Sequence, residues 1–426
     1  MSTYTDEVET KYLDPKSFVD GTRAVFELKG NHLAILPNLR LIDVGVFGQA
    51  GGVYNKLIGA DSIIERVTLY DGRTEISKSV QVGLWSGYLS QAISNSPAQS
   101  LQSQKSGSQV GFQQLSADRL YQYTVPSVNT QATRVTSDGS YIDLQKLLPF
   151  LNNLAMMDQA LYSDTFENLR LEVVFNTAVA KQILSNTAHT ITAQLVPVLA
   201  MDIMDDPKIV GAMRKQMPPQ ISWFEIEHDE VFFPRSTNDG GGADQGVEQT
   251  VNAKLDGLKN KYVKRILQVK EMNNPANYLD NGATTVAGFG RYSSCAFYEE
   301  KIQCRLNGKN LFPRNGMTGN MERLHYLSDS WGDGFCYIGA NQMDIDSGQL
   351  VGSDAAQGKK LTGQLSYNGW FIDDMISDLQ INHSRTGLND TALFRPSTNA
   401  VRVHYFSEVR KVWSRMKNGF YNIQYA

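Results

Sequence analysis

The sequence predicts an all-β protein, and three observations support that fold class. Most of the 426 residues fall into short apolar or alternating runs of about four to eight residues, separated by Gly, Asn, Asp, Ser and Pro. Helical periodicity is rare, and the abundant glycines and aromatic residues (35 Gly, 19 Tyr, 18 Phe) suit strands joined by turns. Many regularly spaced strands with few helices favour a sandwich or jelly roll over alternating βα units.

The strand-like runs are spread over both halves of the chain. We expect strands at residues 24–28, 33–46, 63–70, 169–175, 190–200, 222–233, 261–271, 296–306, 363–371 and 401–407. Helices are expected at residues 77–93, 144–154 and 408–416, which have the best helical periodicity. Residues 94–108, 236–246 and 344–360 are small and polar, which predicts exposed loops.

Two pairs of similar segments indicate two copies of one β fold. Residues 65–73 and 300–309 each run as an alternating strand into Asp71-Gly72 or Asn307-Gly308, then into a basic residue and a further strand. Asp-Gly and Asn-Gly supply the positive φ that a type I′ hairpin turn requires. Strands 168–175 and 399–406 form the second pair, also separated by about half the chain. A repeat at this separation predicts a duplicated sandwich.

Two successive prolines, Pro218 and Pro219, mark the expected boundary between the copies, because they do not fit inside a central strand or helix. The predicted organisation is an N-terminal arm at residues 1–20, a first sandwich at 21–210, a linker at 211–219 and a second sandwich at 220–426. A chain of 47.5 kDa is large enough for two such domains.

Composition and charge exclude several classes of protein. With 40 basic and 44 acidic residues, the chain lacks the basic excess on which non-specific nucleic-acid binding depends. Its first residues do not resemble a secretory signal, and its longest apolar stretch, residues 191–204, is too short and too polar to span a bilayer. Three cysteines without CxxC spacing argue against a disulfide scaffold and a zinc site. We therefore expect synthesis inside the cell and no secretion.

No catalytic, cofactor-binding or metal-ligating residue is predicted, so the chain is not expected to be an enzyme. It contains no GxSxG elbow, no HExxH motif and no P-loop. Asp344-Ile345-Asp346 begins like a calcium loop, but Ala355 stands where the EF-hand places its bidentate Glu. Asp373 and Asp374 are interpreted as a solvated pair or a turn, and not as general acid/base partners, because neighbouring carboxylates on a strand point to opposite faces. The histidines are scattered and are interpreted as surface or packed residues: His32, His189, His228, His325, His383 and His404.

Three stretches resemble the double jelly-roll major capsid proteins. They are residues 54–90, where the hairpin leads into an expected helix after Glu75, residues 143–154 followed by the strand 169–175, and residues 394–399 followed by the strand 401–406. These are patterns of residue type and order, and the resemblance runs from about residue 20 to the end. The sequence is most similar to the proteins of polinton-like viruses and virophages, in the lineage that includes tectivirus coats and adenovirus hexon.

The resemblance implies an architecture and a function. In this family two eight-stranded jelly rolls stand side by side, and three chains form a homotrimer with a pseudo-hexagonal outline. A structural protein of an icosahedral virion shell is therefore expected, made in the host cell interior and located in the virion. Its expected partners are itself, penton and minor capsid proteins, and an internal membrane or the genome at the inner face. No cofactor and no small-molecule substrate are expected.

The second half carries one basic and one aromatic concentration. The basic residues, Arg402, Arg410, Lys411, Arg415 and Lys417, are interpreted as a solvated face. Contact with lipid headgroups, genome or a minor capsid protein is the alternative. The aromatic residues Phe371, Tyr405, Phe406, Trp413 and Phe420 are expected in the core.

Two other classes share part of this pattern. A carbohydrate- or receptor-binding jelly-roll spike protein would have the same strands and would expose aromatic and acidic side chains in a groove. A jelly-roll enzyme of the cupin kind would need His and carboxylate ligands clustered on neighbouring strands. The spacing of the histidines argues against the enzyme.

Overall fold

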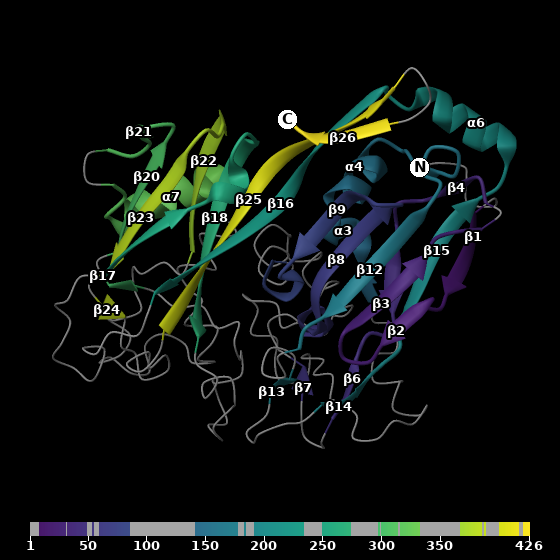
Figure 1. The fold of residues 1–426 in the computed structure, drawn as a ribbon, viewed down its shortest axis with the longest axis horizontal. Helices are drawn as coiled ribbons and strands as arrows, with labels where there is room; N and C mark the ends of the chain where they lie inside the picture. Colours follow the sequence, from purple (N-terminus) through teal and green to yellow (C-terminus); the bar gives the residue numbers. More distant parts are fainter. Residues whose placement is uncertain are drawn as a thin grey trace.

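The chain, described by a computed structural model, forms two β-sandwiches that lie side by side (Figure 1). The structure describes residues 8–30, 32–48, 53–54, 59–85, 141–177, 183–184, 191–233, 249–273, 297–298, 300–313, 316–332, 367–385, 387–388, 400–416 and 421–426. The predicted loops at 94–108, 236–246 and 344–360 lie outside these ranges. Among the described helices, none has the length and apolar character needed to cross a membrane.

The first sandwich contains two main antiparallel sheets. One has the order β2 (Ser17–Val19), β3 (Arg23–Glu27), β12 (Leu169–Phe175), β8 (Ile64–Asp71) and β9 (Thr74–Val80). The other has the order β10 (Tyr141–Asp143), β5 (Arg40–Ile42), β15 (Val198–Met204), β4 (Ala34–Ile35) and β11 (Leu161–Tyr162), with β1 (Val8–Leu13) on the far side of β15. Short strands pair at one end: β6 (Val46–Gly48) with β14 (Ile191–Gln194), and β7 (Val53–Tyr54) with β13 (Ile183–Leu184).

The second sandwich repeats this arrangement with longer strands. One sheet has the order β16 (Gln220–Phe233), β25 (Ala400–Arg415), β18 (Tyr262–Asn273) and β22 (Tyr367–Met375), and β26 (Tyr421–Tyr425) pairs with β25. The facing sheet has the order β17 (Gln249–Lys254), β23 (Leu379–Arg385), β20 (Lys301–Leu306) and β21 (Lys309–Asn310). A further short pair joins β19 (Phe297–Tyr298) and β24 (Gly387–Leu388).

The two sandwiches have the same topology. In the first, the principal strands in chain order are β1, β3, β5, β8, β9, β10, β12 and β15; in the second they are β16, β17, β18, β20, β21, β22, β23 and β25. In each half one sheet joins the first, eighth, third and sixth of these strands, and the other joins the second, seventh, fourth and fifth. This antiparallel order, with its long crossovers between sheets, is that of an eight-stranded jelly roll, so the fold class predicted from the sequence is confirmed.

The two predicted hairpins occupy equivalent positions, but the turns differ. The hairpins β8–β9 and β20–β21 both join the fourth and fifth strands of their sandwich. Asn307 and Gly308 both have positive φ, 49° and 82°, as a type I′ turn requires. In the first hairpin only Gly72 has positive φ, because Asp71 pairs with Thr74 and the central residues are Gly72 and Arg73.

The second pair of repeated segments is not equivalent. Residues 168–175 contain β12, the seventh strand of the first sandwich, whereas residues 399–406 contain part of β25, the eighth strand of the second. The structural counterpart of β12 is β23. Both segments alternate apolar and polar residues, and this pattern marks a half-buried strand without identifying its place in a sheet.

Helices are few among the described residues, and one of the expected ones, at 408–416, is wrong. Residues 144–154 are helical, as predicted, in α3 (Leu144–Leu147) and α4 (Pro149–Met156). The expected helix at 77–93 begins later than predicted, because residues 77–80 belong to β9; residues 82–85 are helical, and 86–93 lie outside the described ranges. Residues 408–415 belong to β25. Over these residues β25 pairs with β16 on one side and with β18 and then β26 on the other, and this pairing overrides local helical preference.

The predicted boundaries also differ from the observed elements. Residues 8–13 and 17–19 pair as β1 and β2, so much of the expected N-terminal arm is part of the first sandwich. Residues 211–216 of the expected linker belong to α6 (Pro207–Gln216), which begins inside the predicted first sandwich and which Asp206 caps by accepting from the amides of Lys208 and Ile209. The predicted strand 33–46 is divided into β4, β5 and β6, since Pro37 lacks an amide donor and Asp43 has a positive φ of 56°.

The two hydrophobic cores share their longest strands. One cluster fills the first sandwich, yet it includes Ile221 and Trp223 of β16 and Trp413 of β25. The other ends of the same strands supply Phe233 and Val403 to the second core. Strands of 14 and 16 residues extend roughly 45–50 Å, which is far enough to cover two sandwiches. The two sandwiches are therefore fused through β16 and β25.

Candidate functional site

A buried ion pair lies where the two sandwiches meet. Glu225 on β16 accepts from Trp223 Nε1 at 3.0 Å and from Ser77 Oγ of β9 at 3.1 Å. Lys411 on β25 donates to the carbonyl of Ile76, also on β9, at 2.9 Å, and its Nζ lies 3.9 Å from Glu225 Oε2. Burial raises the pKa of Glu225 to about 6, although Lys411 lowers it. These polar contacts fix β9 of the first sandwich against β16 and β25.

A second carboxylate extends this junction. Glu227 accepts from the Tyr425 hydroxyl at 2.6 Å and from Lys261 at 3.2 Å, and it lies 3.3 Å from Lys78 Nζ of β9. Burial opposes its ionisation, but Tyr425 and the two lysines hold the pKa of Glu227 below its ordinary value. The junction thus combines groups from β9, β16, β25 and β26 with Lys261, which directly precedes β18.

The core of the second sandwich contains a polar network centred on Glu300. This side chain is fully buried and accepts from Lys270 Nζ at 2.7 Å and from Arg323. His383 Nε2 lies 2.7 Å from its other oxygen, and Asn368 donates to that oxygen at 3.0 Å. Burial favours the neutral acid, but Lys270 and Arg323 hold the pKa of Glu300 far below its ordinary value. The strands that supply these groups belong to both sheets, so the network joins the sheets inside the core.

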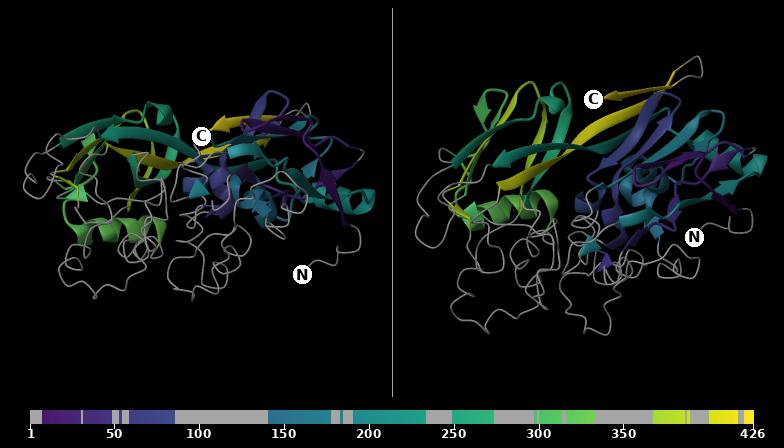
Figure 2. Two further views of the ribbon diagram at one scale, coloured as in Figure 1. Left: turned by 90° about the horizontal axis from the view of Figure 1, so that it is seen from below. Right: turned by 60° about the horizontal axis from the view of Figure 1, so that its bottom comes forward.

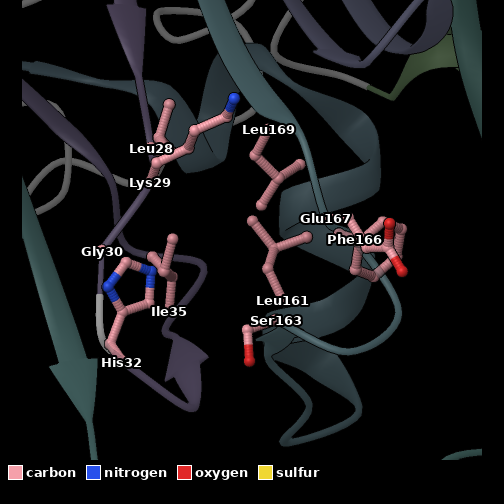
Figure 3. A pocket seen from close by; sticks show the side chains of 10 residues that line it. All are labelled: Leu28, Lys29, Gly30, His32, Ile35, Leu161, Ser163, Phe166, Glu167 and Leu169. Atoms are coloured by element: carbon pink, nitrogen blue, oxygen red, sulfur yellow. The ribbon is translucent and has the colours of Figure 1, made fainter.

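A cavity lies in the first sandwich (Figure 3). Its volume is about 400 Å³, and its apolar lining comes from Leu28, Ile35, Leu161, Phe166 and Leu169. Lys29, His32, Ser163 and Glu167 add polar groups. Figure 3 shows the His32 ring and the Glu167 carboxylate on opposite sides of the cavity, so these two groups do not form an acid–base pair.

The residues of the predicted basic concentration are partly buried and partly exposed, and so are those of the aromatic concentration. Lys411 is buried in the junction, whereas Arg410 and Arg415 are exposed and Lys417 lies outside the described residues. The basic residues therefore do not form the single solvated face that was predicted, because neighbouring side chains on a strand point in opposite directions. Among the aromatic residues, Tyr405, Phe406 and Trp413 are buried as predicted. Phe371 is 45% exposed, and Phe420 lies outside the described ranges.

The structure brings together three residues that looked scattered in the sequence. His228 and Glu230 of β16 lie beside His404 of β25, and His228 Nε2 is 2.9 Å from His404 Nδ1. The signal available in the sequence was the His-x-Glu spacing, which places two potential metal ligands on one face of a strand. The cross-strand partner could not be found from spacing, because it is 174 residues from Glu230 in the chain.

Asp373 and Asp374 are exposed, as predicted for a solvated pair. Asp373 has a positive φ of 51° and accepts from the Tyr262 hydroxyl. His325 is also exposed and lies beside Asp329 on α7 (Asn320–Trp331), while His189 and residues 344–346 lie outside the described ranges.

The fold defines the class of architecture to which the chain is similar: the double jelly roll of viral major capsid proteins. VP54 of PBCV-1, in a structure where it was fitted into a reconstruction of the virophage Sputnik, matches with a TM-score of 0.59 and 13% identity over 98% of this chain and 97% of VP54. A chain of the PBCV-1 virus capsid matches with a TM-score of 0.57 and 13% identity over 98% of this chain and 97% of that one.

The mavirus major capsid protein is similar over 100% of this chain and 91% of its own, with a TM-score of 0.56 and 10% identity. No protein-family model matches the sequence, and a search of curated proteins finds no match. At these identities the likeness is one of fold, and it extends across both sandwiches.

Proposed function

We propose that the chain is a structural major capsid protein that acts by assembly and has no enzymatic activity. The observation that carries this proposal is the fusion of two jelly rolls of identical strand order through β16 and β25, which supply side chains to both cores. Two similar sandwiches in one chain supply two sectors of a ring, so three chains supply six. A homotrimer with a pseudo-hexagonal outline would tile an icosahedral shell.

Exposed apolar side chains support a head-to-tail contact between copies. Phe371 and Met375 on β22 are 45% and 48% exposed, and Tyr12 on β1 is 66% exposed. β1 lies at one end of the molecule and β22 in the sandwich at the other end (Figure 1). A closed ring requires such heterologous contacts, in which different faces of each subunit meet.

The location and remaining partners belong to the same proposal. A shell protein would reside in the virion, contact neighbouring trimers, and meet penton and minor capsid proteins. The exposed Arg410 and Arg415 offer positive charge to an acidic partner such as an internal membrane or the genome. Each of the two jelly rolls of the chain would occupy one sector of the trimer.

Light scattering or native mass spectrometry on the purified chain tests the proposal. The expected mass is about three times 47.5 kDa, unchanged by reductant, because packing rather than disulfides would hold the trimer. The double substitution F371E/M375E should shift the population towards monomer, since it introduces charge into an apolar contact. Lys215→Glu on exposed α6 makes the same change in net charge and should leave the trimer intact. A stable wild-type monomer at micromolar concentration would contradict the proposal and favour the receptor-binding spike.

A further inference from the structure

Three potential ligand groups share one face of the β16–β25 pair. His228 and Glu230 are two residues apart on β16, and Glu230 stands directly opposite His404 in the register of the two strands. Their neighbours Val231 and Val403 point into the second core, so the His228, Glu230 and His404 side chains lie on the other face of the sheet. We call these three residues the HEH cluster.

The distances within the HEH cluster suit a small metal ion. His228 Nε2 lies 2.9 Å from His404 Nδ1, and Glu230 Oε2 lies 4.0 Å from the same Nδ1. One ligand atom from each residue fits within a span of 4.8 Å. Two nitrogens on a tetrahedral zinc ion are about 3.3 Å apart, given zinc–nitrogen bonds of about 2.0–2.1 Å. Binding would replace the hydrogen bond between the two imidazoles: their nitrogens would separate by about 0.4 Å, and the carboxylate would move closer to His404 Nδ1.

The surroundings hold the rings in place. His404 is 1% exposed, and its ring stacks on that of His228 with centroids 5.2 Å apart. Phe406 packs against His228 at 5.1 Å and against Trp85 at 5.1 Å, and Trp85 in turn contacts Trp331 of α7. Figure 2 shows α7 beneath this sheet. Two rigidly held imidazoles from different strands are pre-organised ligands, which lowers the cost of ordering them around an ion.

Arg402 is the charged neighbour that opposes a cation. Its Nη1 lies 3.4 Å from Glu230 Oε2, so it competes with a metal ion for that oxygen. The carboxylate has a second oxygen for coordination, and the Arg402 side chain is 30% exposed. Removal of this arginine should therefore strengthen metal binding, whereas it would weaken a cluster that serves only as an ion-pair network.

We propose that the HEH cluster binds one divalent transition-metal ion per chain, with zinc as the best-suited ion. Imidazole nitrogen and one carboxylate are ligands for zinc, cobalt and nickel, whereas calcium and magnesium prefer oxygen ligands alone. Three protein ligands leave a fourth position for water or for another donor. The ion would link β16 to β25, the strands that connect the two sandwiches. It would act as a structural clamp, in accord with a non-enzymatic shell protein.

Metal titration of the full-length chain tests this inference. After dialysis against a chelator, Zn²⁺ should bind with a stoichiometry of one per chain in calorimetry and should raise the melting temperature. Co²⁺ should give the visible absorption of a tetrahedral nitrogen–oxygen site, and Mg²⁺ should not displace it. Absence of Zn²⁺ binding to the wild-type chain would overturn the proposal, whether or not the chain forms trimers, so the outcome is independent of the proposed assembly.

Variants locate the ion. Glu230 is exposed, so Glu230→Gln should leave the metal-free melting temperature unchanged and weaken Zn²⁺ binding by at least about 10–100-fold, the loss known for outer-shell partners. His228→Gln should have a similar or larger effect, and Arg402→Gln should tighten binding. His325→Ala is the matched control, because it removes an exposed histidine beside a carboxylate, Asp329, at 3.3 Å. Equal loss of binding in His325→Ala, or unchanged binding in Glu230→Gln and His228→Gln, would place the ion elsewhere and refute the site.

Discussion

The pKa values of two fully buried glutamates are shifted in opposite directions. Glu225 faces one ammonium group at 3.9 Å, and burial raises its pKa to about 6. Glu300 contacts Lys270 at 2.7 Å and also pairs with Arg323, so its pKa is held far below the ordinary value. Desolvation penalises the charged form in both cases. The number and proximity of the cations decide whether the neutral or the ionised carboxyl is favoured.

The raised pKa of Glu225 predicts a pH-dependent contribution to stability. A carboxyl with a higher pKa in the folded chain binds protons more tightly when folded, so its contribution is fully present below about pH 4.5 and is lost as the pH rises through about 6. Glu225→Gln should remove this dependence. The free energy of unfolding of the wild type, relative to the variant, should fall by about 2 kcal/mol across this window.

Denaturant titrations at pH 4, 5, 6 and 7 measure this difference. Glu9→Gln, which alters an exposed carboxyl on β1, serves as the control and should track the wild type at every pH. A constant difference between wild type and Glu225→Gln from pH 4 to 7 would contradict the assignment.

The network around Glu300 predicts a large cost for removing one charge. Glu300→Gln leaves Lys270 and Arg323 buried without their anion, and the expected loss in the free energy of unfolding is about 3–5 kcal/mol. Chemical denaturation measures the loss. Replacing Glu300, Lys270 and Arg323 together with apolar residues of similar volume should recover much of it, because no unpaired charge then remains. A single Glu300→Gln variant as stable as the wild type would show that the network contributes little.

At the scale of the element, β25 illustrates how one strand serves two cores. Val403 and Val409 lie in the second core, and Trp413 on the same strand lies in the first. Trp413 packs near Phe166 and Tyr421, with ring centroids 6.2 and 6.0 Å away. Its position in the second half of the sequence therefore does not indicate which sandwich it stabilises.

Truncation of Trp413 should loosen the first sandwich. Trp413→Ala creates a cavity in a buried site, with an expected cost of about 3–5 kcal/mol in the free energy of unfolding. Hydrogen exchange should accelerate in β12 and α4 more than in β20 and β23. Met416→Ala, at a side chain that is 46% exposed, should change neither stability nor exchange. Faster exchange confined to β20 and β23 would contradict the assignment of Trp413 to the first core.

At the scale of the whole molecule, the two sandwiches are topological copies that do not separate cleanly. Ile221, Trp223 and Trp413 lie in the first core, and Glu225 and Lys411 contact β9. A boundary placed at the two prolines therefore divides the chain where the sequence changes but cuts through a shared core.

Cutting the chain at this boundary should leave the first half incomplete. Residues 1–219 alone should retain strand structure but lose the near-ultraviolet circular dichroism of fixed aromatic rings and bind a hydrophobic dye. Mixing or co-expression with residues 220–426 should restore the sharp signal, because the second fragment returns Trp223 and Trp413 to the first core. A cooperative unfolding transition of fragment 1–219 alone would show that the first core is self-sufficient.

The sequence by itself determined the fold class and the equivalent positions of the two hairpins, whereas the second repeated pair, 168–175 and 399–406, is not equivalent in the structure. These features depend on local signals in consecutive residues. The alternation of β12 predicts a half-buried strand, and Asn307-Gly308 predicts a hairpin turn. Only the tertiary structure decided that residues 408–415 are a strand, that Trp413 serves the first core, and that His404 stands opposite Glu230. Each of these depends on pairing between segments far apart in the chain, and no local pattern records which strand lies next to which.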